Sequence, residues 1–176
     1  MYGMKKSTLC LLPHDPSWKK CFEDEKKRIL YAVNLKTIGI EHIGSTSIPN
    51  VLAKPILDLA LHVEKCELSN LANTLKSLGY DYRGPYGEDF GHYYAVFDRD
   101  EMRYCQAHIY TNQTADWKCK IKFRDVLRKN DELAAEYSSY KQDLAQKVLT
   151  KGEYAAIKSN WLDSFIKKVT AVQSND

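Results

Sequence analysis

The sequence predicts an α+β fold: a small mixed β-sheet flanked by helices on one side, and a C-terminal helical portion that completes the domain. Three patterns support this prediction. Residues 56–63 alternate in polarity as a half-buried strand does, and residues 92–110 carry the pattern of a β-hairpin. From Thr114 onward, apolar residues recur at helical spacing. We expect residues 1–176 to form one domain, because a chain of this length can enclose one substantial core.

The N-terminal part is expected to form a short extended segment and a first helix. Residues 8–12 are typical of a short strand. Asp15 then suits a helix N-cap and Pro16 the first helical position, and the helix is expected to end near Val33. Four residues recur at helical spacing on its expected core face: Trp18, Phe22, Glu25 and Ile29.

Residues 38–63 are the most informative part of the chain. A strand pattern at Ile38 and Ile40 leads into a turn of four small residues, Gly44, Ser45, Thr46 and Ser47. In the next strand, one face consists of Leu57, Leu59, Leu61 and Val63, and the other of Ile56, Asp58, Ala60 and His62. The first face is expected to lie on the core. The second is expected to face a cleft, with the small-residue turn at its rim.

This arrangement is typical of a site that handles phosphate groups. Gly44 lets the backbone approach a ligand closely, and the hydroxyl and amide groups of Ser45, Thr46 and Ser47 can surround phosphate oxygens. Lys54 would add a positive charge. Asp58 is the type of ligand that Mg²⁺ takes together with substrate phosphates. The same residues also fit an ordinary turn and a hydrogen-bonded aspartate.

The middle of the chain is expected to contain a helix, a loop and the hairpin. A helix over residues 67–78 should end at Gly79, which suits a left-handed C′ position. Residues 80–89 are rich in tyrosine, glycine and acidic residues and are predicted to form a loop over the cleft. The hairpin strands are expected at residues 92–98 and 102–110.

His108 is the candidate general base or metal ligand of the hairpin. A neutral imidazole can ligate a metal or accept a proton from a hydroxyl, although a hydrogen bond to a neighbouring tyrosine would also explain this residue. Alternation places His108 and Gln106 on the same side of the sheet as Asp58, and Arg103 on the opposite side. Further carboxylates for a metal could come from three acidic residues: Glu88, Asp89 and Glu101.

The C-terminal part is predicted to contain three helices, with breaks at residues 130–131 and 150–152. The first helix carries Arg124. In the last helix Tyr154 and Lys158 lie four residues apart and therefore share a face.

Composition and charge narrow the classes of function. The net charge of +3 does not predict a nucleic-acid partner, and no apolar run is long enough to predict a membrane span. The five cysteines show neither zinc-ligand spacing nor a C-x-x-C pair, so a cytoplasmic protein with free thiols is expected. The oligomeric state is left undetermined.

The string EHIGSTSIPNVLAKPILDLAL resembles the GrpB family of the polymerase-β-like nucleotidyltransferase superfamily. Further matches are LPHDPSWKKCFEDEKKRI, FRDVLRKNDELAAEYSSYK and EYAAIKSNW. The resemblance implies a nucleotidyltransferase fold, phosphate contacts from Arg124 and Lys158, and a link to dephospho-CoA kinase, to which family members also occur fused. Active nucleotidyltransferases carry a second carboxylate two residues after the first, where this chain has Ala60.

The first functional hypothesis is transfer of a nucleotidyl group from an NTP to a small-molecule acceptor, assisted by Mg²⁺ on Asp58 and by His108. The alternative is a non-catalytic module that binds nucleotide or phosphate, is linked to coenzyme A metabolism, and lacks the full set of metal-binding carboxylates. A third hypothesis is an interaction protein that uses the tyrosine-rich loop as its surface.

Overall fold

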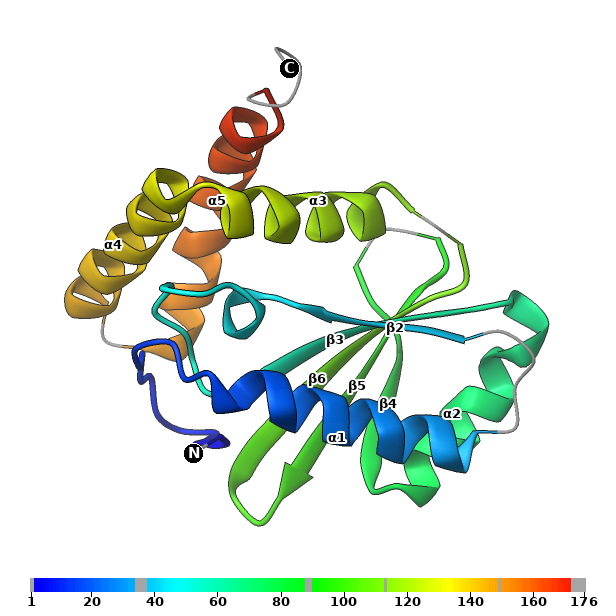
Figure 1. The fold of residues 1–176 in the computed structure, drawn as a ribbon. Coiled ribbons are helices and arrows are strands. Elements are labelled where there is room, and N and C mark those ends of the chain that lie inside the picture. Colours follow the sequence, from blue (N-terminus) through cyan, green and yellow to red (C-terminus); the bar gives the residue numbers. More distant parts are fainter. Residues whose placement is uncertain (1, 34–37, 88–89, 113, 149, 172–176) are drawn as a thin grey trace.

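The computed structural model describes residues 2–33, 38–87, 90–112, 114–148 and 150–171. At its centre lies a six-stranded sheet in the order β2-β3-β6-β5-β4, with β1 paired to β6 (Figure 1). The strands are β1 (Met4–Lys5), β2 (Ile38–Ile43), β3 (Leu57–Val63), β4 (Tyr80–Pro85), β5 (His92–Arg99) and β6 (Met102–Tyr110). β3 and β6 run parallel, and every other neighbouring pair is antiparallel. The mixed sheet predicted from the sequence is therefore confirmed.

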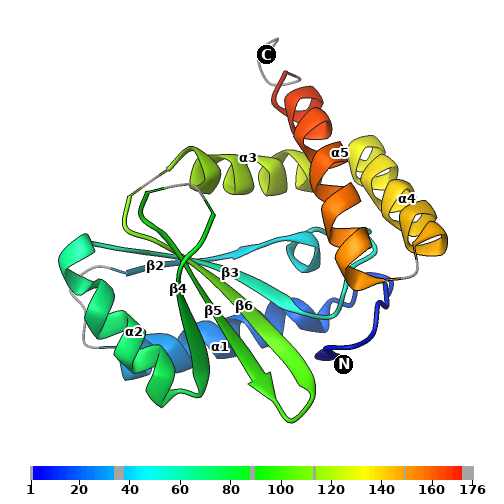
Figure 2. The ribbon, with the colours of Figure 1, turned by 180° about the vertical axis from the view of Figure 1, so that it is seen from behind.

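Helices cover both faces of this sheet (Figures 1 and 2), so the expectation of helices on one side is wrong. α1 (Ser17–Ala32) and α2 (Leu68–Ser77) lie on one face, and α3 (Ala115–Lys129) crosses the other (Figures 1 and 2). α4 (Asp131–Lys147) and α5 (Lys151–Ala171) extend the α3 side as a helical unit. The two small 3₁₀ turns are η1 (Ser45–Ser47) and η2 (Lys65–Glu67). The C-terminal helical portion is thus present, and it leaves α3 and α5 above the polar face of β3.

The main core lies between the sheet and helices α1 and α2. The predicted apolar face of β3 is fully buried there, and the predicted core face of α1 is buried as well. Cys105, Ala107 and Ile109 of β6 lie in the same cluster. The opposite face of the two strands carries Asp58 and Gln106, as alternation predicted.

Two local expectations about the N-terminal part have different outcomes. The Asp15 carboxylate accepts a hydrogen bond from the Ser17 amide at 2.9 Å, so Asp15 caps α1 and Pro16 already has helical dihedral angles. The strand expected over residues 8–12 is wrong in extent. Only Leu12 forms a bridge, to Ala53, while the paired N-terminal strand lies earlier, at β1.

The loop predicted over residues 80–89 is also wrong in part, because its first six residues form the edge strand β4. β4 pairs with β5 through a register shift between Tyr82 and Gly84, and Gly84 has a φ of +79°. The glycine therefore marks a bulge within a strand rather than the loop that its composition indicated. Glu88 and Asp89 lie outside the described residues.

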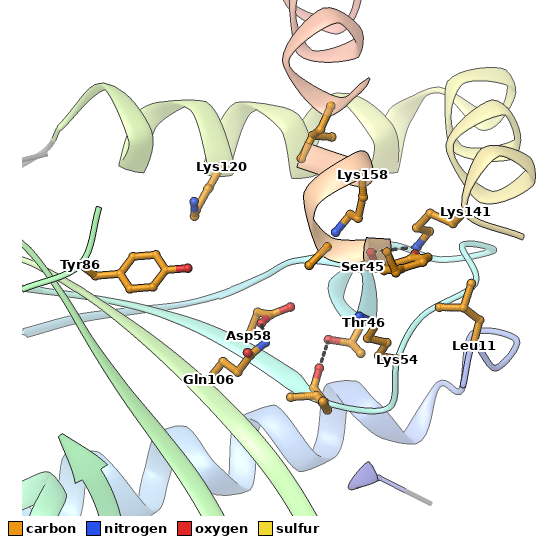
Figure 3. A pocket seen from close by; sticks show the side chains of 14 residues that line it. Leu11, Ser45, Thr46, Lys54, Asp58, Tyr86, Gln106, Lys120, Lys141 and Lys158 are labelled. Carbon is orange, nitrogen blue, oxygen red and sulfur yellow. Dashed lines mark hydrogen bonds between the residues drawn. The ribbon is translucent and has the colours of Figure 1, made fainter. Parts of the chain in front are cut away.

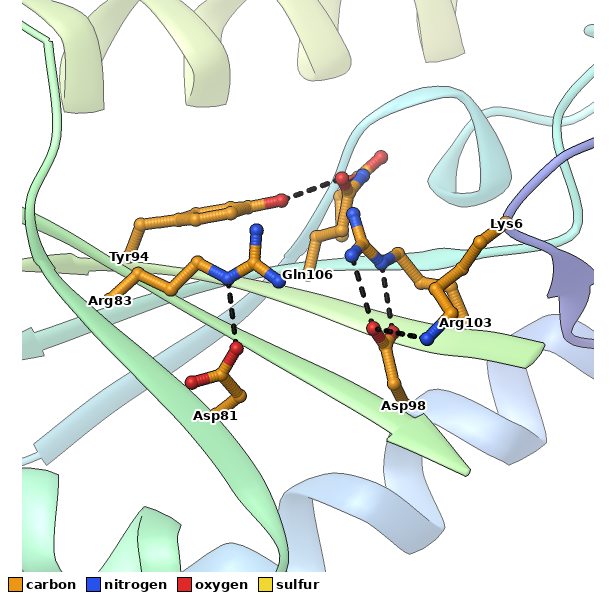
Figure 4. A network of polar contacts seen from close by, with 8 residues as sticks. Lys6, Asp81, Arg83, Tyr94, Asp98, Arg103 and Gln106 are labelled. Carbon is orange, nitrogen blue, oxygen red and sulfur yellow. Dashed lines mark hydrogen bonds and ion pairs between the residues drawn. The ribbon is translucent and has the colours of Figure 1, made fainter. Parts of the chain in front are cut away.

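A second irregularity moves Arg103 to the site face. The β5–β6 register skips one residue of β6 between the pairs Phe97–Cys105 and Asp98–Arg103. The extra residue reverses the alternation that the sequence predicted, so Arg103 points to the same side as Gln106 (Figure 4). Arg103 there forms a two-point ion pair with Asp98, with nitrogen–oxygen distances of 2.9 and 3.1 Å.

Within the described part of the chain, no helix combines the length and apolar character that crossing a membrane would need.

Candidate functional site

A pocket of about 350 Å³ lies between the polar face of the sheet, the η1 turn and helix α5 (Figure 3). Asp58 of β3 and Gln106 of β6 lie on its sheet side. Ser45, Thr46 and Lys54 line it from the connection between β2 and β3. Three more lysines reach it from three different helices: Lys120 from α3, Lys141 from α4 and Lys158 from α5. We call this site the lysine pocket.

The close approach of the η1 turn to Asp58 depends on Gly44. Gly44 has a φ of +69° and a ψ of −175°, a conformation that is essentially restricted to glycine. A Cβ atom placed on it would lie 2.2 Å from the Oδ2 atom of Asp58 and 2.9 Å from the Asp58 Cβ. The sequence pattern of a glycine turn facing an aspartate is therefore realised as direct packing of backbone against carboxylate.

Asp58 is held by a short chain of hydrogen bonds across the sheet. Gln106 lies opposite Asp58 in the β3–β6 register and donates from Nε2 to the Asp58 Oδ1 atom at 2.8 Å. The Tyr94 hydroxyl donates in turn to the Gln106 Oε1 atom at 2.6 Å (Figure 4). Burial raises the pKa of Asp58, and the positive charge of Lys158 opposes this increase. The network fixes one carboxylate oxygen and turns the other toward Gly44.

Lys54, Tyr154 and Lys158 all line the pocket, so Tyr154 and Lys158 share one face of α5 as their spacing predicted. The Lys54 ammonium lies 4.3 Å from the centroid of the Tyr154 ring, a cation–π distance. The pKa of Lys158 is held above its ordinary value, mainly by the Tyr137 hydroxyl and to a smaller extent by the charge of Asp58. Lys158 therefore stays cationic beside the only carboxylate that lines the pocket among the described residues.

Lys141 is a site residue that sequence reasoning missed. It is 1% exposed, and its ammonium donates to the Ser45 Oγ at 2.9 Å and also to the Leu52 carbonyl oxygen. Burial lowers its pKa well below the ordinary value of lysine. The signal was present, because Lys141 interrupts the apolar stripe of α4 between Tyr137 and Leu144.

The three hydroxyl groups of the η1 turn make different contacts. Ser45 and Thr46 line the lysine pocket, and Ser45 is oriented by Lys141. The Thr46 hydroxyl contacts His42 Nε2 at 3.0 Å, and the Ser47 hydroxyl donates to the Gly44 carbonyl at 2.7 Å. Ser47 lies on the far side of the turn and does not line the lysine pocket.

Arg124 also lies away from the lysine pocket. It borders a separate hollow of about 370 Å³ between α1, β2 and α3. Its guanidinium is largely buried and donates to the Glu41 carboxylate at 2.7 Å, to the His42 carbonyl at 3.0 Å and to Asp125 at 2.7 Å. The phosphate contact expected of Arg124 stays a prediction, and these partners give it a role in fastening α3 to the edge strand β2.

His108 lies on the site face, but its ring is engaged by its neighbours. A 3.0 Å hydrogen bond joins His108 Nδ1 to His92 Nε2, and the rings of Tyr86 and Tyr94 pack around it. Burial lowers the pKa of His108 to about 3. Its proposed part in catalysis stays a prediction, since His108 does not line the lysine pocket.

Buried histidines make the fold sensitive to acid. Burial also lowers the pKa of His42 to about 3, with Arg128 and Arg124 adding to the effect. Between pH 6.5 and about 3 the unfolded chain binds more protons at His42 and His108 than the folded chain does, so stability falls as the pH falls. The upper limit is about 1.4 kcal/mol per pH unit for each histidine.

We expect His108→Gln to lose less free energy of unfolding than wild type as the pH falls. Glutamine does not titrate and can still hydrogen-bond to His92. Urea unfolding of both proteins at pH 7 and pH 5 measures the difference. An identical loss between the two pH values in both proteins would contradict the prediction.

The residues present limit how a metal could be held. At the position of the second nucleotidyltransferase carboxylate, Ala60 is 1% exposed and packs in an apolar cluster with Ile43 and Tyr110. Glu101 lies at the exposed turn between β5 and β6. Among the described residues, no group of three or more His, Cys, Asp or Glu side chains gathers as a metal site. The donors fit one Mg²⁺ held by Asp58 together with ligand phosphates. They do not fit two ions roughly 3.5–4 Å apart.

The fold is shared with nucleotidyltransferase-like proteins. A crystal structure of the Cid1 poly(U) polymerase with MgGTP bound has a TM-score of 0.51 at 9% identity, covering 72% of this chain and 41% of that chain. A shorter stretch of 74 residues is 35% identical to a dephospho-CoA kinase of Mycobacterium bovis, covering 40% of this chain and 18% of that protein.

More extensive similarity is found with proteins of one family. The UPF0157 protein BH1888 of Halalkalibacterium halodurans is 32% identical over 167 residues, covering 94% of this chain and 84% of that protein. The crystal structure of the conserved protein GrpB from Enterococcus faecalis has a TM-score of 0.81 at 30% identity, covering 91% of this chain and 96% of that chain. The family model for the GrpB protein matches residues 8–168. The chain therefore belongs to the GrpB family.

Proposed function

We propose that the lysine pocket binds the phosphate groups of a nucleotide. The observation that carries the proposal is the lining, in which four lysines surround a single carboxylate; Lys54, Lys120 and Lys158 supply the positive charge, because burial lowers the pKa of Lys141. Ammonium groups held together in a concave site concentrate positive potential and attract a compact polyanion. A triphosphate is such an anion, and the pocket of about 350 Å³ lies within the range of small-molecule sites.

The four lysines would have different tasks. Lys54 and Lys158 face each other across the pocket and would contact the phosphate oxygens directly (Figure 3). Lys141 would position the Ser45 hydroxyl, which it already holds at 2.9 Å. Lys120 is paired with Asp116 at 2.7 Å and would add charge from the α3 side.

A second candidate function is transfer of a nucleotidyl group from an NTP to a small-molecule acceptor. The position of Asp58 favours it, because the carboxylate lies between Lys158 and Tyr86 and packs against the η1 turn (Figure 3). The Cid1 structures with bound MgGTP and MgATP share the fold and support a nucleotide ligand by analogy. The partial match to dephospho-CoA kinase places coenzyme A intermediates among the ligands to test.

In this transfer, an acceptor hydroxyl would attack the α-phosphorus while the bond to the β-phosphate oxygen breaks. Pyrophosphate would leave with the bonding electrons, and the proton of the acceptor would pass to water. Mg²⁺ on Asp58 would neutralise charge on the reacting phosphate. Lys54 and Lys158 would stabilise the leaving pyrophosphate, and Gly44 would keep the η1 turn packed against Asp58.

Binding can be tested by the thermal stability of wild type and Lys158→Gln with inorganic tripolyphosphate, the four NTPs and coenzyme A intermediates, each with and without Mg²⁺. A ligand at a hundred times its Kd should stabilise the wild type by about 2.7 kcal/mol. Lys158→Gln should weaken binding about tenfold or more, because it removes a hydrogen bond between charged groups.

Lys27→Gln is the matched control, since Lys27 is an exposed lysine of α1 on the other face of the sheet. It removes the same charge from the protein and should leave binding unchanged. The absence of stabilisation by every ligand, or equal weakening in both variants, would overturn the proposal.

A further inference from the structure

The end of the lysine pocket that faces away from Lys54 and Lys158 is formed by an aromatic side chain. Tyr86 lines the pocket directly after β4, and its ring is 45% exposed. Figure 3 shows the ring pointing into the pocket, with Asp58 and Gln106 between it and Lys158. The pocket therefore runs from Tyr86, with Lys120 above it, past the Asp58 carboxylate to the end that holds Lys54 and Lys158 (Figure 3).

The Tyr86 ring is held in place by its neighbours. Tyr94 supports it with a centroid separation of 4.7 Å and an interplanar angle of 30°. The rings of His92 and His108 meet it edge-on at 5.1 and 5.7 Å. The Tyr86 amide also donates to the His92 carbonyl at 2.9 Å. Since these contacts restrain the ring before any ligand binds, stacking on it would cost little conformational entropy.

Tyr82 of β4 and Tyr86 directly after it have different surroundings. Tyr82, two positions after the start of β4, packs instead against the main core. The tyrosine-rich loop of the interaction-protein hypothesis is thus divided, with Tyr82 on the core and Tyr86 at the lysine pocket. An aromatic surface beside a polyanion site suits a ligand that has an aromatic ring and a phosphate chain.

We propose that Tyr86 is the stacking surface for the base of the bound nucleotide, which makes the pocket selective for nucleotides over inorganic polyphosphates. This inference rests on the proposed binding of phosphates by the lysines. The base would lie on Tyr86, the sugar and α-phosphate beside Asp58, and the outer phosphates between Lys54 and Lys158. Stacking alone distinguishes bases weakly, so we expect the preference to be for an aromatic base in general.

The test compares the affinities of ATP and inorganic tripolyphosphate for wild type, Tyr86→Ala and Tyr86→Phe by titration calorimetry in the same Mg²⁺ buffer. Tyr86→Ala should weaken ATP binding by roughly 5- to 150-fold, the range for loss of one base–aromatic stack. Tripolyphosphate binding should be unchanged in that variant. Tyr86→Phe should keep ATP affinity within about threefold, since it retains the ring.

Tyr31→Ala is the matched control, because Tyr31 is 97% exposed on α1, away from the pocket. It should change neither affinity. If tripolyphosphate and ATP both fail to bind wild type, the proposed function is wrong. If tripolyphosphate binds but Tyr86→Ala leaves ATP affinity intact, or weakens both ligands equally, only the role of Tyr86 is wrong.

Discussion

Replacing Gly44 by alanine is expected to lower the free energy of unfolding by more than about 2 kcal/mol and to abolish ligand binding in the lysine pocket. Two costs add. The backbone at Gly44, with φ +69° and ψ −175°, is unfavourable for any residue with a Cβ. The new Cβ would also lie 2.2 Å from the Asp58 Oδ2 atom, so the carboxylate or the η1 turn must move. Urea unfolding and ligand-induced stabilisation measure the two effects separately.

Gly84→Ala separates the backbone cost from the clash. Gly84 also has a positive φ, +79°, but nothing lies within 4 Å of a Cβ placed there. This variant should lose about 1 kcal/mol of stability and keep ligand binding. If Gly44→Ala loses no more stability than Gly84→Ala and still binds ligand, the contact between the turn and Asp58 is not what positions the site.

The parts of the fold that the sequence predicted correctly are those specified by local periodicity. Alternation in β3 assigned Asp58 to the site face, and helical spacing assigned Trp18 and Ile29 to the core. These patterns depend only on neighbours in the chain. Alternation also assigned Gln106 to the same side as Asp58, but the parallel pairing of β3 with β6 that sets the two residues opposite each other was not predicted.

The misplaced elements depend on tertiary partners. Residues 80–85 form β4 because β5 supplies the hydrogen bonds of an edge strand, and a bulge absorbs Gly84. A bulge in β6 likewise reversed the direction predicted for Arg103. One inserted residue changes the face of a side chain, and nothing in single-sequence alternation shows where the insertion falls.

The basic residues of the site illustrate a further limit. Arg124 and Lys158 both matched the family pattern, but only Lys158 reaches the lysine pocket. Arg124 is directed to the edge of β2 by Glu41 and the His42 carbonyl, partners about eighty positions earlier in the chain. Lys141 was missed because a lysine in an amphipathic helix is usually solvated. Here its side chain is buried, and the Ser45 hydroxyl and the Leu52 carbonyl accept hydrogen bonds from it.

Asp58→Asn is expected to stabilise the protein at pH 7 and, if the pocket catalyses transfer, to abolish turnover. Burial raises the pKa of Asp58 in the folded state. Between the unfolded value of 3.8 and this raised value, the folded protein binds more protons, so the aspartate lowers stability as the pH rises through that window. Asparagine avoids this cost of about 1.4 kcal/mol per unit of pKa shift. It can also keep an amide oxygen toward Gln106.

Urea unfolding at pH 7 and at pH 3 measures the sign of the stability difference between Asp58→Asn and wild type. The two proteins should be equally stable at the lower pH, where Asp58 of the wild type is protonated in both the folded and the unfolded state. Asp98→Asn is the opposing control. Although burial opposes it, the ion pair with Arg103 lowers the pKa of Asp98, so this variant should be less stable at pH 7. Destabilisation by Asp58→Asn at pH 7 would instead make Asp58 a structural partner of the lysines.

Ligand binding and turnover by Asp58→Asn separate the two candidate functions. If Asp58 holds Mg²⁺ with the nucleotide, Asp58→Asn should lose the metal-dependent part of NTP stabilisation and any pyrophosphate release. Metal-free tripolyphosphate should bind at least as well, since one negative charge leaves a pocket lined by four lysines. A variant that is more stable, binds phosphate and does not react would mean that the chain keeps a partly buried carboxylate at a cost in stability for its chemistry. Unchanged metal dependence would favour a binding module.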